Sequence, residues 1–228
     1  MIIFKAITYV MAQTAKPLTI EISERTGTVS ALALVPKNAS AMLVLAHGAG
    51  AGMTHVFMET MAEELSNLGI ATLRYNFPYM EKGSKRPDPP AVAEKTVAMV
   101  MEFTHKKYPK LPLFAGGKSF GGRMSSQRVS KECPEFLSGI VFFGFPLHAI
   151  GKPGMERAAH LSDIKIPMLF LQGTKDKLAE IELIKKVIKK LKAGTLVKFE
   201  GADHSFKVSK QNILPDLAVA AAEWIEKN

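Results

Sequence analysis

The segment 116–122 contains the residues whose types and spacing indicate chemistry most clearly. It reads Gly-Gly-Lys-Ser-Phe-Gly-Gly, and Gly117, Ser119 and Gly121 match the pattern Gly-x-Ser-x-Gly. In this pattern a serine sits on a sharp strand-to-helix turn, and the small neighbours let the turn close. A phosphate-binding loop is excluded, because that motif needs a further glycine where Pro112 stands. The spacing therefore predicts Ser119 as a nucleophile.

A serine hydroxyl is a weak nucleophile unless a base accepts its proton, and His204 is the predicted base. His204 follows the last expected strand, at the sheet edge where the serine turn is also expected. Asp176 follows the preceding expected strand and would orient the imidazole. Asp203 is the less favoured carboxylate, because adjacent side chains on an extended loop usually point apart. The order Ser119, Asp176, His204 is one of three familiar orders of serine triads.

A small-residue loop at 47–53, His-Gly-Ala-Gly-Ala-Gly-Met, follows another apolar run. It is not a dinucleotide fingerprint, because Met53 stands where the last glycine is needed. Such a loop leaves backbone N–H groups open to an oxyanion, and a second donor is expected from the residue after the nucleophile. These donors are predicted to be Ala49 (or Gly50) and Phe120.

Short apolar runs alternate with helical patterns along the chain. This alternation predicts an α/β fold in which a mostly parallel, twisted sheet carries helices on both faces. In such sheets ligands bind at the carboxyl ends of the strands, where the polar residues above lie. Thr54 is expected to cap the first helix. We expect strands at 18–22, 29–35, 41–46, 70–73, 113–115, 140–143, 168–171 and 196–199, and helices at 54–68, 91–107, 123–131, 180–191 and 215–226. We expect a long loop at 75–90 and an irregular stretch with a helical patch at 148–163.

Length and composition are those of a globular chain. Of 228 residues, 47% are apolar and 22% are charged, which excludes a disordered, collagen-like or disulfide-knotted protein. No apolar run reaches the ~20 residues of a membrane-spanning helix. Residues 17–228 are expected to form a single domain, and 1–16 a disordered or strand-like extension. A secretory signal is not expected, because Lys5 interrupts an already short apolar stretch. The single cysteine, Cys133, indicates a reducing compartment, and we expect the cytoplasm.

Four of these segments together resemble the α/β-hydrolase superfamily, over residues 18–225. More narrowly, the chain resembles a lid-less, dienelactone-hydrolase-like branch, which the segments 76–79, 86–90 and 145–148 also suggest. Dienelactone hydrolases use a cysteine where this chain has Ser119, so a dienelactone substrate is not implied. The four segments are His47-Gly48-Ala49-Gly50, Gly117-Lys118-Ser119-Phe120-Gly121, Gly173-Thr174-Lys175-Asp176 and Gly201-Ala202-Asp203-His204.

The resemblance implies a serine hydrolase that cleaves a carboxylic ester or thioester of a small substrate through an acyl-enzyme at Ser119. It implies no metal and no cofactor, and the chain has no His-Glu-x-x-His motif. Some relatives are subunits of chromatin complexes, so the alternative is an inactive hydrolase fold that acts as a binding or scaffold subunit. The short stretch between 143 and 168 leaves no room for a substantial lid and predicts an open site.

Side chains near the strand ends are the candidates for lining the pocket. The basic ones among them favour an anionic substrate, in a chain of net charge +9. A nucleic acid or a membrane is not an expected partner, because stacking aromatics and a recognised binding fold are both lacking. The predicted lining residues are Gly50, Phe77, Tyr79, Met124, Phe145 and His148, and the basic residues are Lys82, Lys85, Arg86, Lys118 and Lys175.

Overall fold

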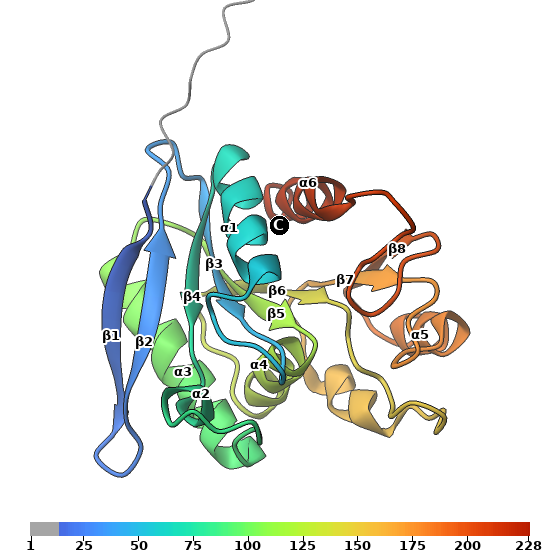
Figure 1. The fold of residues 1–228 in the computed structure, drawn as a ribbon, viewed down its shortest axis with the longest axis horizontal. Helices are drawn as coiled ribbons and strands as arrows, with labels where there is room; N and C mark the ends of the chain where they lie inside the picture. Colours follow the sequence, from blue (N-terminus) through green and yellow to red (C-terminus); the bar gives the residue numbers. More distant parts are fainter. Residues whose placement is uncertain (1–13) are drawn as a thin grey trace, which may run out of the picture.

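The computed structural model describes residues 14–228, which build one eight-stranded sheet (Figure 1). The strand order is β1-β2-β4-β3-β5-β6-β7-β8; β1 and β2 pair antiparallel with their neighbours, and all pairings from β4 to β8 are parallel. This confirms the predicted fold class. The strands are β1 (Lys16–Ser23), β2 (Gly27–Leu34), β3 (Ala41–Ala46), β4 (Ile70–Tyr75), β5 (Leu113–Lys118), β6 (Leu137–Phe143), β7 (Met168–Gly173) and β8 (Gly194–Phe199).

Helices cover both faces of the sheet, as Figure 1 shows. One face packs against α1 (Val56–Asn67) and α6 (Leu214–Ile225), and the other against α3 (Pro90–Lys107), α4 (Phe120–Lys131) and α5 (Ile181–Ile188). Because both faces are covered, β3, β4 and β7 are buried at every position. This explains why β3 is a continuous apolar run in the sequence and why β4 and β7 are apolar except at Thr72, Arg74 and Gln172.

Helix starts differ from the sequence-based expectation. The N-cap of α1 is His55, whose Nδ1 accepts a hydrogen bond from the N–H of Phe57 at 3.2 Å, so the expected cap at Thr54 is wrong. The helix expected from 123 begins already at Phe120. The expected loop 75–90 contains a short helix, α2 (Pro78–Glu81). It begins at Pro78, whose fixed φ suits the first helical position.

The connection between β6 and β7, residues 144–167, holds only the short 3-10 helix η1 (Glu156–Asp163). No lid domain is inserted there, as predicted. The expected N-terminal extension lies largely outside the described residues, and β1 begins at Lys16. Within residues 14–228, every helix is too short or too polar to cross a bilayer.

Candidate active site

Ser119 stands on a sharp turn between β5 and α4. Its backbone has φ 50° and ψ −112°, a conformation that costs a non-glycine residue free energy and persists only where the surroundings enforce it. The two motif glycines let the chain pass close to the end of β3. A Cβ on Gly117 would lie 2.2 Å from the carbonyl oxygen of Ala46, and one on Gly121 would lie 2.6 Å from the same atom. The turn can therefore form only with glycine at both positions.

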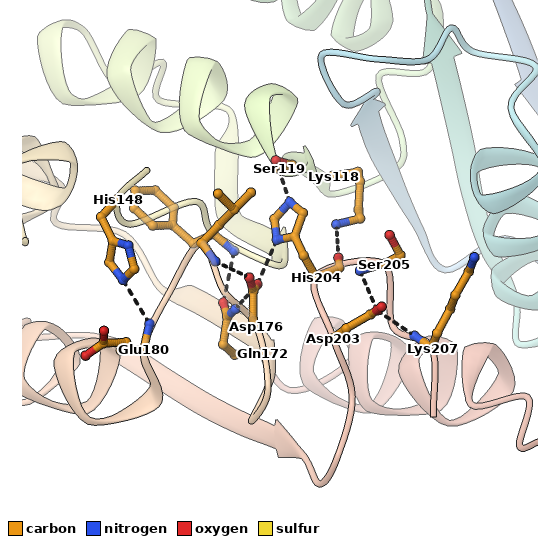
Figure 2. A network of polar contacts seen from close by, with 12 residues as sticks. Lys118, Ser119, His148, Gln172, Asp176, Glu180, Asp203, His204, Ser205 and Lys207 are labelled. Atoms are coloured by element: carbon orange, nitrogen blue, oxygen red, sulfur yellow. Dashed lines mark hydrogen bonds and ion pairs between the residues drawn. The ribbon is translucent and has the colours of Figure 1, made fainter. Parts of the chain in front are cut away.

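The side chains of Ser119, His204 and Asp176 form a hydrogen-bonded chain (Figure 2). His204 Nε2 lies 2.8 Å from Ser119 Oγ, and His204 Nδ1 lies 2.7 Å from Asp176 Oδ2. A carboxylate only accepts hydrogen bonds, so Nδ1 carries the proton and Nε2 is the free acceptor for the serine hydroxyl. The structure thus brings together the three residues that the sequence predicted, in the order of contact that general-base chemistry needs.

Asp176 is buried and fully hydrogen-bonded. Its Oδ1 accepts from the N–H of Leu178 at 2.7 Å, and its Oδ2 accepts from Gln172 Nε2 at 2.6 Å as well as from His204. Gln172 also accepts from the N–H of Phe145 at 3.0 Å, which fixes its amide. These donors hold the carboxylate in one orientation toward the imidazole. The sequence analysis missed Gln172, although a polar residue at the end of the buried strand β7 was a usable signal.

Asp203, the less favoured alternative to Asp176, shapes the loop that carries His204. Its Oδ1 accepts from the N–H groups of Ser205 at 2.8 Å and Lys207 at 2.9 Å, as Figure 2 shows. The side chain is engaged in this turn, whereas Asp176 bonds the imidazole.

The loop after β3 is held by His47 and Tyr79. His47 Nδ1 donates to the carbonyl of Gly48 at 2.8 Å, and its Nε2 accepts from the N–H of Phe77 at 3.1 Å. Burial lowers the pKa of His47 to about 4, although the bond to the Gly48 carbonyl opposes the shift. The imidazole is therefore neutral, as Nε2 must be to accept. Tyr79 Oη donates to the carbonyl of Ala49 at 2.9 Å, so this carbonyl is turned away from the site.

The two predicted oxyanion donors, Phe120 and Ala49, come from the start of α4 and from the loop after β3. Phe120 opens α4, where the first N–H groups of a helix have no partner in the helix. Ala49 lies in the loop that reaches the site from β3 and lines the same cavity as Ser119. Among residues 14–228 neither N–H has a hydrogen-bond acceptor.

A cavity of about 850 Å³ opens at Ser119 and His204. It runs between the start of α1 and the loop 205–212, and none of the described residues lining it is acidic. Its apolar wall includes Phe57, Leu178, Phe206 and Leu214, and its basic residues are Lys118, Lys207 and Lys210. Of the predicted lining residues only Gly50 belongs to it, and Lys207 and Lys210 were not foreseen.

The aromatic and methionine side chains predicted to line the pocket lie in the hydrophobic core instead. Phe77, Tyr79, Met124 and Phe145 are each at most 2% exposed and are not among the cavity's lining residues. The physical reason is that large apolar side chains beside strand ends gain more by packing between sheet and helix than by facing solvent. Three of them still support the site through hydrogen bonds. The N–H of Phe77 donates to His47, and the N–H of Phe145 donates to Gln172. The hydroxyl of Tyr79 donates to the carbonyl of Ala49.

His148 was also predicted to touch substrate, but both of its ring nitrogens are engaged. Nδ1 donates to the carbonyl of Ala149 at 2.9 Å, and Nε2 accepts from the N–H of Glu180 at 3.1 Å. With Lys175 it borders a separate hollow of about 460 Å³. Of the other predicted basic residues, Lys118 lines the main cavity, whereas Lys82, Lys85 and Arg86 are exposed and outside it.

A second serine–histidine pair, Ser126 and His160, has a different arrangement. Ser126 Oγ lies 2.8 Å from His160 Nε2, but the same hydroxyl also donates to the carbonyl of Arg123 at 3.0 Å. Both contacts are satisfied when His160 Nε2–H donates to the Ser126 hydroxyl and this hydroxyl donates to the Arg123 carbonyl. In general-base catalysis the hydroxyl would instead donate its proton to Nε2. Ser126 is fully buried, and among residues 14–228 no carboxylate is hydrogen-bonded to His160. Ser119 is therefore the better candidate for a nucleophile.

Comparison with known proteins places the chain in a family. A family model described as an alpha/beta hydrolase domain matches residues 39–222, so the chain belongs to this family. Among solved structures it resembles a dienelactone hydrolase from Anabaena variabilis (TM-score 0.78, 21% identity, 95% of this chain and 99% of that one). It also resembles a serine hydrolase without a lid from Xanthomonas campestris (0.73, 19%, 94% of each chain). A third is the ferulic-acid-bound Est1E from Butyrivibrio proteoclasticus (0.74, 15%, 92% and 98%). These three likenesses concern the fold.

Proposed function

We propose that this protein is a serine hydrolase that cleaves carboxylic esters or thioesters of small substrates. The observation that carries the proposal is the hydrogen-bonded chain Ser119–His204–Asp176 at the mouth of a cavity. A buried carboxylate, an imidazole with one free nitrogen and a hydroxyl on a strained turn are the parts that acyl transfer requires. The exposed, unpaired Cys133 fits action in the reducing cytoplasm.

In the proposed reaction, Ser119 Oγ attacks the acyl carbon while its proton passes to His204 Nε2. The resulting imidazolium is stabilised by Asp176, and the oxyanion by the N–H groups of Ala49 and Phe120. His204 then gives the proton to the leaving alcohol or thiol, which leaves the acyl group on Ser119. A water molecule then attacks the acyl carbon while its proton passes to His204 Nε2. His204 returns this proton to Ser119 Oγ as the acid leaves.

The cavity supports a substrate with an apolar part and an anionic end. Phe57, Phe206 and Leu214 offer apolar surface, while Lys207 and Lys210 bring positive charge without an acidic residue among the described lining. Such a cavity favours anions over equally sized neutral molecules. A carboxylated ester is thus the preferred substrate in this proposal.

The proposal is tested by labelling the protein with a fluorophosphonate, which reacts with activated serines. We expect wild type to be labelled, Ser119→Ala to be unlabelled, and Ser126→Ala to be labelled at close to the wild-type rate. A panel of acyl chains and leaving groups on the same three proteins then defines the substrate. Absence of labelling and of hydrolysis in wild type would favour the alternative of a binding or scaffold subunit.

A further inference from the structure

Lys118, the residue before the nucleophile, makes contacts with two other segments that line the site. Its Nζ donates to the backbone carbonyl of His204 at 2.5 Å, as Figure 2 shows. The same nitrogen lies 5.8 Å from the ring centre of Phe57 and 5.3 Å from that of Phe206. One ammonium group thus connects the end of β5, the start of α1 and the loop that carries His204.

The two aromatic rings form a stacked pair beside this ammonium. Their centroids are 6.1 Å apart and their planes differ by 19°. A cation within about 6 Å of an aromatic ring centre is attracted by the ring, and more strongly when water is excluded. Phe206 lies in the loop that carries His204 and has a positive φ of 60°. Lys118 therefore holds this loop at two points, the carbonyl of His204 and the ring of Phe206.

The ammonium also lies close to the imidazole itself. A Cβ on Gly144, whose φ is 73°, would be 3.2 Å from Lys118 Nζ and 3.5 Å from His204 Nδ1, so a side chain there would wedge between the two groups. The separation of the two nitrogens is accordingly less than the sum of these distances.

The charges around Lys118 come from three loops. Asp176 and Asp203 attract the ammonium, and Lys207 and His55 line the same cavity. Burial outweighs this attraction and lowers the pKa of Lys118 to about 8. The cationic form thus predominates at neutral pH and is lost as the pH rises above about 8.

We propose that Lys118 is a positioning residue for the proposed hydrolase: its ammonium group fixes the backbone of His204 against Ser119 and holds the ring of Phe206 in the same loop. This rests on the proposed function for its catalytic meaning, but the contacts that hold the loop of His204 exist whether or not the protein turns over esters. It assigns a role to the variable position of the Gly-x-Ser-x-Gly motif in this chain.

The first readout is amide hydrogen exchange at Ser205 and Lys207, whose N–H groups bond to Asp203 in the loop that carries His204. In Lys118→Met we expect both amides to exchange about tenfold faster, because the hydrogen bond to the His204 carbonyl and the contact with the Phe206 ring are gone. In Lys118→Arg, which keeps a cationic donor, exchange stays near that of wild type. Lys190→Met, which removes an exposed lysine in the turn after α5, is the matched control.

Kinetics provide the second readout. With a neutral ester, Lys118→Met is expected to lower kcat about tenfold with little change in KM, and Lys118→Arg is expected to restore most of this loss. If the methionine variant does not fold, Lys118→Gln, which is neutral but keeps an N–H donor, replaces it. Exchange rates and a kcat equal to those of wild type in the neutral variant would overturn the proposal. If wild type is not labelled by fluorophosphonate, the proposed hydrolase fails, and the exchange rates alone still decide whether Lys118 holds the loop of His204.

Discussion

Replacing Asp176 by asparagine tests whether the buried carboxylate does what its contacts suggest. The carboxylate accepts three hydrogen bonds, from Leu178, Gln172 and His204, whereas an amide offers one oxygen. If the amide turns its NH₂ toward His204, the imidazole must take the other tautomer, and Nε2 can no longer accept the proton of Ser119. If it turns its oxygen there, the imidazolium loses its negative partner. Either orientation removes an essential interaction.

The expected size of this effect is large. In serine triads the loss of the carboxylate with retained geometry lowers kcat by about 10⁴-fold, which corresponds to about 5 kcal/mol of transition-state stabilisation. The replacement also leaves a buried N–H group opposite a donor, so we expect the free energy of unfolding to fall by about 1 to 3 kcal/mol. The loss of activity should thus far exceed the loss of stability.

The assay is kcat/KM with an activated neutral ester, measured beside the thermal midpoint of each variant. Asp203→Asn is the matched control, because an asparagine oxygen still accepts from the N–H groups of Ser205 and Lys207. We expect this control to stay within about threefold of wild type. If a folded Asp176→Asn variant loses less than tenfold, or the two variants lose activity equally, the role given to Asp176 is wrong.

Three further predictions follow from the site and its surroundings. Ser126→Ala should keep activity within about threefold and lose about 1 kcal/mol of stability with its hydrogen bond to His160; an inactive but folded variant would contradict the choice of Ser119. A carboxylated ester should be hydrolysed faster than its neutral analogue at low salt, and the double variant Lys207→Gln, Lys210→Gln should reduce this preference. If the carboxylated ester is hydrolysed at the same rate at low and at high salt, the preference is not electrostatic. His47 has a folded-state pKa lowered to about 4 from 6.5, so its contribution to stability is full above pH 6.5 and is lost as pH falls. The free energy of unfolding should fall by about 3 kcal/mol between pH 6.5 and pH 4 for this reason. Urea unfolding of wild type should show this fall, and an equally large fall in His47→Gln would contradict it.

The fold and the three site residues were predictable because their signals are local. Strands buried on both faces are apolar runs, and the serine turn needs glycines at fixed positions, as the close approach of Gly117 and Gly121 to Ala46 explains. His204 and Asp176 could be chosen because parallel strands bring their carboxyl ends to one edge. These signals do not depend on how side chains pack.

The cavity was not predictable in the same way. Phe77, Tyr79, Met124 and Phe145 stand near strand ends, but whether such side chains face a cavity or the core depends on the helices packed over them. The true wall includes the loop 205–212, which has neither helical nor strand periodicity. The contact of Lys118 with the carbonyl of His204 joins residues far apart in the chain, and one sequence contains no signal for such a pair.

The most direct test of the account is to isolate the acyl-enzyme. Wild type is mixed with p-nitrophenyl acetate, quenched with acid within the burst of nitrophenol release, and analysed by intact mass and peptide mapping. We expect one acetyl group per chain, located on Ser119, and none in Ser119→Ala. Turnover without a covalent intermediate, or an acetyl group that maps to Ser126 in active protein, would contradict it.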